Sequence, residues 1–301
     1  MLKVVSVSLG SSSRNKVTRS MFLDQQVELS RIGTDGNLAQ AVAMIRELDG
    51  QVDAIGLGGI DLYLCAGKRK YVVRDAVRLA RAAKKTPVVD GSGLKLTLET
   101  RQVAQLAQDF PGPPLKGAKV LLVSAVDRWG MATALGEYAG EIVYGDMMFA
   151  LGIAIPLRTR RSIQILASIL LPVITKLPFK LLYPTGEKQK VHKPRHTEYF
   201  VWADWICGDF HFIRRNLPPR LDGKVVLTNT TTEEDVELLR SLGLSYLVTT
   251  TPVIEGRSFG MNVLEGCLVA LIRQRGDIVS PENYEVYLNK LDLKPSVTKL
   301  N

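Results

Sequence analysis

The residues from 224 to 252 place two strand patterns on either side of one amphipathic helix. A β-branched run at 225–227 comes first, and a second short apolar run follows at 246–248. Between them, Thr231 and Glu234 have the spacing of a capping box. Gly243 is placed at the position after the helix, where a glycine in the left-handed conformation commonly ends it. This order predicts a parallel strand–helix–strand unit, whose polar strand ends lie at the ligand-binding edge of an open sheet.

The same alternation occurs in both halves of the chain. Strand patterns at 4–9, 27–32, 52–57 and 87–89 alternate with helix patterns, including 39–48 and 71–85, and a second series begins at 118–123 and 141–144. The Pro- and Gly-rich segment 110–114 separates the two series. The sequence predicts an α/β protein with two Rossmann-like parallel-sheet domains: a substrate-type domain at 1–112, a nucleotide-binding domain at 113–279 and a C-terminal tail at 280–301.

Positive charge is concentrated in one segment. The chain has 39 Lys and Arg against 30 Asp and Glu, a net charge of +9. Residues 151–200 have nine of the cations and two of the acids, and they include an apolar run at 163–171 that is too short to span a bilayer. We interpret this segment as a basic, apolar helical insertion that packs on the second domain, covers a ligand or touches a membrane surface through 153–184. No nucleic-acid partner is expected, because no recognised motif accompanies the charge.

The sulfur and imidazole side chains indicate neither a disulfide framework nor a metal site. His192 and His196 have a spacing that suits a metal only on a helix, and Pro194 between them argues against one. The N-terminal residues do not have the pattern of a signal peptide, so a reduced, cytoplasmic protein is expected. Three widely separated cysteines have apolar neighbours: Cys65, Cys207 and Cys267.

Polar loops follow the strands of the first domain. A Ser-rich loop after residue 9 could wrap an anion with its amide groups, and Arg14 could complete the grip. Later strand ends present Asp61, Asp90 and Lys95. If these loops share one edge of the sheet, that edge is a site; alternatively, the glycines in them serve only to form tight turns.

In the second domain, the loop 124–130 follows the first strand and Asp146 ends the second. An acidic residue at that strand end corresponds to the ribose-binding carboxylate of a dinucleotide fold. The loop has a single glycine, Gly130, and lacks the GxGxxG pattern. The loop alone therefore does not indicate a pyrophosphate site.

Several short blocks resemble the shikimate and quinate dehydrogenase group. Residues 260–265, GMNVLE, are similar to that group's Gly-Met-Leu-Val-x-Gln, with Glu265 in place of the substrate-binding glutamine. Residues 8–15 echo its Ser-x-Ser-Pro-x-x-His-Asn loop, and 89–95 echo Asn-Val-Thr-x-Pro-x-Lys, with Lys95 at the matching distance. Nearly the whole chain also resembles bacterial proteins labelled quinate 5-dehydrogenase, through VSLGSSSR, DGSGLK, YPTGE, GDF and TNTTT.

This resemblance implies an NAD(P)-dependent dehydrogenase that oxidises an alicyclic hydroxy acid such as quinate. Lys95 would take the hydroxyl proton, with a pKa lowered by burial or a cationic neighbour and with Asp90 as its electrostatic partner. The expected substrate-binding residues are Ser8, Ser11, Ser12, Ser13, Arg14, Asp61 and Glu265. The expected residues for NAD, or for NADP, are Ser124, Asp127, Arg128, Gly130, Asp146, Asn229, Thr230, Thr250 and Thr251.

A second interpretation stays open beside the dehydrogenase. The same architecture suits a non-redox binding or regulatory protein, or a transferase that holds phosphate in the Ser-rich loop. The missing glycine signature favours this alternative, whereas Asp146 and the block 260–265 favour the dehydrogenase. A homodimer is also expected.

Overall fold

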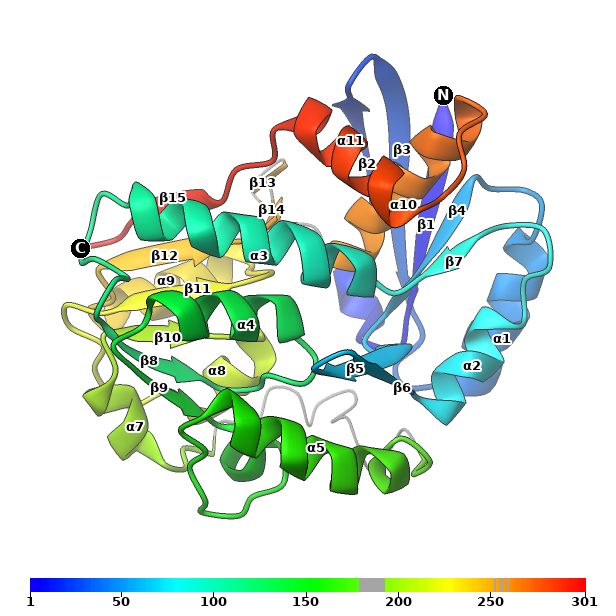
Figure 1. Ribbon diagram of the computed structural model, residues 1–301. Coiled ribbons are helices and arrows are strands. Elements are labelled where there is room, and N and C mark those ends of the chain that lie inside the picture. Colours follow the sequence, from blue (N-terminus) through cyan, green and yellow to red (C-terminus); the bar gives the residue numbers. More distant parts are fainter. Residues whose placement is uncertain (179–192, 252, 255–256, 259) are drawn as a thin grey trace.

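The computed structural model describes residues 1–178, 193–251, 253–254, 257–258 and 260–301. In these ranges the chain forms two α/β lobes, each built around one sheet (Figure 1). The first sheet has the strand order β2-β3-β1-β4-β7, which is parallel except for β2 at its edge. Its strands are β1 (Leu2–Ser8), β2 (Lys16–Phe22), β3 (Gln25–Gly33), β4 (Ala54–Gly58) and β7 (Val88–Val89).

The second sheet has the order β15-β12-β11-β10-β8-β9, and only β15 runs antiparallel to its neighbour. The N-terminus therefore lies in the first lobe and the C-terminus in the second (Figure 1). The strands are β8 (Lys119–Leu122), β9 (Glu141–Tyr144), β10 (Trp205–Cys207), β11 (Val225–Thr228), β12 (Tyr246–Thr249) and β15 (Ser296–Lys299). Two small hairpins stand apart from the sheets: β5 (Tyr63–Ala66) with β6 (Arg69–Val72), and β13 (Val253–Ile254) with β14 (Arg257–Ser258).

Helices cover both sheets. Those beside the first sheet are α1 (Leu38–Leu48), α2 (Arg74–Ala80), α10 (Met261–Gln274) and α11 (Pro281–Leu291). Those of the second lobe are α4 (Trp129–Tyr138), α5 (Arg160–Ile174), α7 (Thr197–Trp202), α8 (Phe210–Asn216) and α9 (Glu233–Ser241). The long helix α3 (Ser92–Gln108) packs against both α4 and α10, and it therefore joins the lobes. Among the helices of the described ranges, none combines the length and the apolar composition that a membrane-spanning segment needs.

The alternation of side chains along β1 explains why both faces of the first sheet are covered. Val4 packs into a core with α10 residues such as Leu264, whereas Val5 and Val7 face a second core that contains Ile45 of α1. Successive residues of a strand point to opposite faces, so a continuous apolar run requires a helix layer on each side.

The predicted strand–helix–strand unit at 224–252 is confirmed as β11, α9 and β12, with β11 and β12 parallel neighbours. Gly243 follows α9 with a φ of +82°, as expected of a glycine that ends a helix. The capping box, however, lies one residue later than predicted. Thr232 accepts from the N–H of Asp235 at 3.3 Å, and the Asp235 carboxylate accepts from the N–H of Thr232 at 2.9 Å.

The helix predicted at 71–85 is wrong in its first part. Residues 71 and 72 belong to β6, which pairs with β5, and α2 spans only 74–80. The β-branched pair Val72 and Val73 favours an extended backbone, and the local pattern did not reveal the partner strand. The edge strand β2 was also not predicted.

The prediction of an α/β protein with two parallel-sheet regions is confirmed. The Rossmann-like classification and the division at residue 112 stay predictions. The helix α10, which lies within the predicted second domain, packs on β1 and β4 of the first sheet. Gly91, with a φ of +90°, leads from β7 into α3, and an added Cβ there would lie 2.7 Å from the N atom of Asn262. The chain thus passes between the lobes close to the first turn of α10.

Candidate functional site

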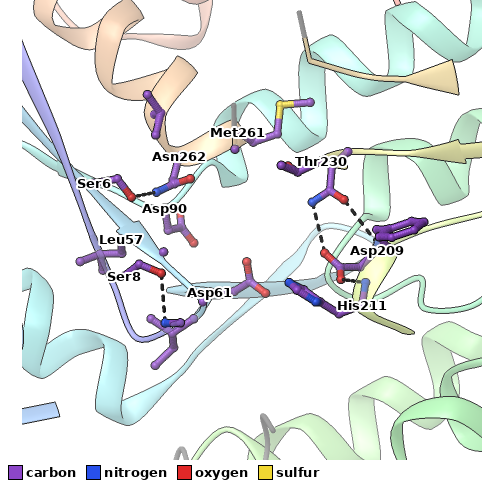
Figure 2. Close-up of a pocket in the computed structure, with 18 of the residues that line it drawn as sticks. Ser6, Ser8, Leu57, Asp61, Asp90, Asp209, His211, Thr230, Met261 and Asn262 are labelled. Atoms are coloured by element: carbon purple, nitrogen blue, oxygen red, sulfur yellow. Dashed lines mark hydrogen bonds between the residues drawn. The ribbon is translucent and has the colours of Figure 1, made fainter. Parts of the chain in front are cut away.

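A cavity of about 280 Å³ lies between the two lobes. Its walls come from the residues that follow β1 and β4 in the first sheet, from those that follow β10 and β11 in the second, and from the first turn of α10. The carboxyl ends of both parallel sheets therefore face the same space, which is where open α/β sheets bind ligands. We call this space the cleft (Figure 2).

Serine and arginine side chains hold the first-lobe wall in place. The Ser8 hydroxyl accepts from the N–H of Gly10 at 3.1 Å and from Nη2 of Arg31 at 3.0 Å, while Nη1 of Arg31 donates to the Ser11 carbonyl. Asn262, on α10, donates to the Ser6 hydroxyl at 2.8 Å (Figure 2). These bonds tie the end of β1 to β3 and to α10.

An ion pair between Lys95 and Asp61 borders the cleft. The side chains are 12% and 14% exposed, so the pair is reachable from the cavity. Burial would lower the pKa of Lys95, but the carboxylates of Asp61 and, to a smaller extent, Asp127 together outweigh burial and raise that pKa above its ordinary value. The ammonium is therefore protonated at neutral pH, and the expected lowering of its pKa is not found.

Asp90 has a different role from the predicted one. Its carboxylate accepts from the N–H groups of Leu62 at 2.6 Å, Tyr63 at 3.3 Å and Ser92 at 3.1 Å. It thereby fixes the residues after Asp61 to the start of α3. The electrostatic partner of Lys95 is Asp61, not Asp90.

On the second-lobe wall, Asp209 is the centre of a hydrogen-bond network. It accepts from the N–H of His211 at 2.9 Å (Figure 2). It also accepts from the amide of Asn229 at 3.2 Å and contacts Arg128 at 3.3 Å. Burial would raise the pKa of Asp209, but His211, protonated at such low pH, and Arg128 lower it to about 2. Burial lowers the pKa of His211 against the attraction of Asp209, so this ring is neutral at pH 7.

Arg128 forms the floor of the cleft. It pairs with Glu99 of α3, and the two side chains are 1% and 0% exposed. Nε of Arg128 and Oε2 of Glu99 have no hydrogen-bond partner within the ranges that the structure describes. Because an isolated charge in this position would be very costly, the pair belongs to the framework of the site.

The cleft brings together nine of the residues singled out by sequence. They are Ser8, Arg14, Asp61, Asp90, Lys95, Asp127, Arg128, Asn229 and Thr230. The others do not line it: Ser11, Ser12, Ser13, Ser124, Gly130, Asp146, Thr250, Thr251 and Glu265.

The Ser-rich loop satisfies its own amide groups. The N–H of Ser12 donates to Asp35 at 2.8 Å, and the N–H of Ser13 donates to the Ser11 hydroxyl at 3.2 Å. The hydroxyls of Ser11 and Ser13 bond to each other at 2.8 Å. These amides are therefore not arranged to wrap an anion, although Arg14 at the end of the loop does line the cleft.

Asp146 does not fit the role of a ribose-binding carboxylate. It is buried, and it accepts from the N–H groups of Ala125 at 2.9 Å and Val126 at 3.1 Å. Burial raises its pKa to about 7 against these two donors. Ser124 is likewise engaged, since its hydroxyl bonds to Asp127 at 2.6 Å. An added Cβ on Gly130 would lie 2.2 Å from the Lys95 carbonyl, so this glycine allows α4 to approach α3.

Three further predicted residues are buried outside the cleft. Thr250 and Thr251 are fully buried, and the Thr251 hydroxyl donates to the Asn229 carbonyl at 2.8 Å. Glu265 is buried on α10, where it accepts from the Tyr284 hydroxyl at 3.0 Å. Burial and the nearby Asp90 raise the pKa of Glu265 to about 7.

Several residues that line the cleft were not predicted. Asp209 lies two residues after the end of β10, and His211 lies in the first turn of α8. The apolar run at 205–207 indicates this strand end in the sequence. Lys16 and Arg31 lie on β2 and β3, and nothing in their local pattern indicates a ligand site. Within the described residues, no group of three or more His, Cys, Asp or Glu side chains could hold a metal ion, and His192 lies outside them.

Solved structures with a detectable likeness to this chain are mainly solute-binding proteins. One, an ABC transporter periplasmic solute-binding protein from Actinobacillus succinogenes with bound D-allose, has 11% identity, covers 93% of this chain and 94% of its own, and has a TM-score of 0.38. Another, from Agrobacterium vitis with bound D-fucose, has 11% identity, coverages of 99% and 95%, and a TM-score of 0.36. A glutamate dehydrogenase variant has 12% identity, coverages of 88% and 63%, and a TM-score of 0.39. These scores are below 0.5, so none assigns a ligand or an activity to this chain.

The comparisons contradict the resemblance to quinate and shikimate dehydrogenases. The family models that match the chain describe domains of unknown function, DUF8753 and DUF8754, and not a quinate or shikimate dehydrogenase family. Three predictions rested on that resemblance and are wrong with it: the oxidoreductase activity, the quinate-type substrate and the NAD or NADP cofactor. Asp146 already accepts from a backbone N–H group of its own lobe, and Lys95 is protonated at neutral pH. Both observations agree with this correction.

Two family models divide the chain near the start of α3. A comparison with curated proteins found no match. Residues 3–90 match DUF8753, a domain of unknown function, and residues 93–300 match DUF8754, also a domain of unknown function. The second match covers more than half of the 301 residues, and the chain therefore belongs to the DUF8754 family.

Proposed function

We propose that this protein binds a small polar molecule in the cleft, and that this ligand has an anionic group and several hydroxyl groups. The observation that carries the proposal is Arg14. Arg14 lines the cleft, and its guanidinium forms no side-chain hydrogen bond or ion pair within the described residues. A guanidinium is suited to bidentate contact with a carboxylate or a phosphate.

Size and charge support this ligand class. A cavity of about 280 Å³ is at the lower end of the range for small-molecule sites, which favours a compact ligand over a peptide. Lys16 and Arg31 line the same side of the cleft as Arg14. Their combined field favours an anion there.

The remaining polar groups favour hydroxyls on the ligand. Asp61, Asp127 and Asp209 offer carboxylate oxygens at the cleft, and the amides of Asn229 and Asn262 offer both donors and acceptors. A hydroxyl group donates to a carboxylate and accepts from an amide, so it can satisfy both kinds of partner at once. The proposal assigns binding to the cleft and no chemical step.

Isothermal titration calorimetry with gluconate, glucose 6-phosphate and uncharged glucose tests the proposal. We expect at least one of the charged probes to bind more tightly than glucose. Arg14→Gln should weaken that probe by about tenfold or more, because a charge-assisted bidentate contact is lost. Arg46→Gln, which removes an exposed arginine of α1, is the matched control and should bind like the wild type. Absence of binding by both charged probes, or equal affinity in the Arg14 variant, would contradict the proposed ligand class.

We also propose a cytoplasmic location, a homodimer and a domain division at residue 112.

A further inference from the structure

The helix α5 has two apolar faces, and one of them is exposed. The buried face has three residues at intervals of four: Ile163, Ala167 and Leu171. Ile165, Ile169 and Val173 follow two positions later and so lie on the opposite side of the helix. They are 53%, 64% and 63% exposed. The first face anchors α5 against β5 and α4, and the second has no partner in the described part of the chain.

Exposed apolar side chains are concentrated around this helix. Sixteen large apolar side chains are exposed in the described residues, and seven of them lie between 151 and 178. In Figure 1, α5 lies at the outer edge of the molecule, below the β5–β6 hairpin. Apolar patches of this kind mark interaction surfaces.

Cations stand at both ends of the exposed stripe. Arg161 lies four residues before Ile165 and so on the same face of the helix, and Lys176 lies in the turn that follows α5, three residues after Val173. Residues 151–178 include no Asp or Glu. We call Arg161, Ile165, Ile169, Val173 and Lys176 the α5 face.

The β5–β6 hairpin brings a second group of cations beside α5. An added Cβ on Gly67 would lie 3.0 Å from Nε2 of Gln164, so the hairpin turn lies against the helix. The turn continues with Lys68, Arg69 and Lys70, all exposed. Together with Arg160, Arg161 and Lys176 they make six exposed cations, none of which forms an ion pair in the described ranges.

We propose that the α5 face docks on an anionic lipid surface. Isoleucine and valine side chains can enter the boundary between headgroups and acyl chains, while lysine and arginine at the ends of the stripe reach the phosphates. The neighbouring hairpin adds charge that attracts an anionic leaflet over a Debye length. A second copy of the chain is a poorer occupant, because two α5 faces would bring like charges together without acids between them. A nucleic acid would leave the apolar stripe unsatisfied.

Co-sedimentation with vesicles tests this proposal and does not depend on the ligand of the cleft. Vesicles of phosphatidylcholine alone are compared with vesicles that contain phosphatidylserine at about 30 mol%. We expect the protein to sediment with the anionic vesicles only, and less at high salt. Ile169→Glu and the double variant Arg160→Gln/Arg161→Gln should each lower the bound fraction by about fivefold or more.

Matched controls alter other exposed sites. The first control is Ile278→Glu, at an isoleucine that is 78% exposed between α10 and α11. The second is Arg46→Gln/Lys290→Gln, which removes two cations elsewhere on the protein. Both control variants should bind like the wild type. Failure of the wild type to bind anionic vesicles would overturn the proposal, as would binding that Ile169→Glu leaves unchanged. A dimer in analytical ultracentrifugation that Ile169→Glu dissociates would assign the face to a second copy instead.

Discussion

Two ion pairs of α3, one turn apart, differ in their access to water. Lys95 and Asp61 are 12% and 14% exposed, whereas Glu99 and Arg128 are 0% and 1% exposed. Lys95 and Glu99 are four residues apart and so lie on one face of the helix. The first pair can rearrange around a ligand, while the second is sealed between α3 and α4. One helical turn therefore separates a group that is available for binding from a group that maintains the fold.

The largest effect is expected from the sealed pair. Glu99→Leu leaves the Arg128 guanidinium buried, and the acidic partners that remain to it among the described residues are Asp209 at 3.3 Å and Asp127 at 4.0 Å. Breaking a buried pair by removing one partner costs about 3–5 kcal/mol. Urea denaturation should show a loss of this size in the free energy of unfolding.

A double variant separates the charge from the packing. In Glu99→Leu/Arg128→Met both charges are absent, so we expect it to be more stable than Glu99→Leu alone. If the single variant loses less than about 1 kcal/mol, the pair is not sealed as described.

The next effect concerns Asp146, a buried carboxylate that forms no ion pair with a cation of the described ranges. Burial raises the pKa of Asp146 to about 7 in the folded protein, whereas an unfolded Asp titrates near 4. Between these values the folded state holds a proton that the unfolded state has lost, so stability falls as pH rises from about 4 to 7. This dependence removes about 2–4 kcal/mol at most.

Asp146→Asn should flatten this pH dependence. The asparagine oxygen can still accept from the N–H groups of Ala125 and Val126, which both bond to Oδ1 of the aspartate. Thermal denaturation between pH 4 and 8 measures the change. Glu265, whose pKa burial also raises to about 7, leaves a residual slope in the variant. A slope equal to that of the wild type would show that Asp146 does not hold the proton.

The sequence predicts elements that depend on local burial, but not contacts that depend on a distant partner. Short apolar runs and helical patterns identified β1, β3, β4, β8, β9, β11, β12, α1 and α9, because each of these depends on local burial. The β5–β6 hairpin and β2 were not predicted, since a strand pairing depends on a partner that lies elsewhere in the chain. The packing of α10 on the first sheet was not predicted for the same reason, because it joins segments that are far apart in the sequence.

For the site, the sequence identified loops but not the partners of their side chains. Asp61 and Lys95 were both singled out, but the predicted partner of Lys95 was Asp90. In the structure Lys95 pairs with Asp61, and Asp90 accepts from backbone N–H groups. Asp146 was interpreted as a ligand-binding group because strand ends resemble each other in sequence, whether their carboxylates face solvent or their own loop. The distinction depends on the direction of a side chain, which no spacing encodes.

A smaller change in stability is expected at the accessible pair. Lys95→Met leaves Asp61 near the cavity, where the carboxylate can take up a proton or contact water, so the loss should be about 1–2 kcal/mol. Burial raises the pKa of Asp61 and Lys95 opposes this, so the variant should have a still higher Asp61 pKa. Relative to the wild type, its stability should therefore fall more steeply as pH rises above about 4. A loss as large as that of Glu99→Leu would erase the difference between the two pairs.

The smallest effect sets the scale for the others. Arg19 and Glu28 form a pair at 3.0 Å on the surface of β2 and β3, and the arginine is 63% exposed. Water screens both charges in either state, so Arg19→Gln should change the free energy of unfolding by less than about 0.5 kcal/mol. The same urea titration applies to all the variants, which makes the values comparable. If Arg19→Gln costs as much as Lys95→Met, then the loss in the cleft reflects the general removal of a cation from a strongly basic protein. If the three pairs instead rank as Glu99, Lys95 and Arg19, burial is the variable that decides what each ion pair contributes.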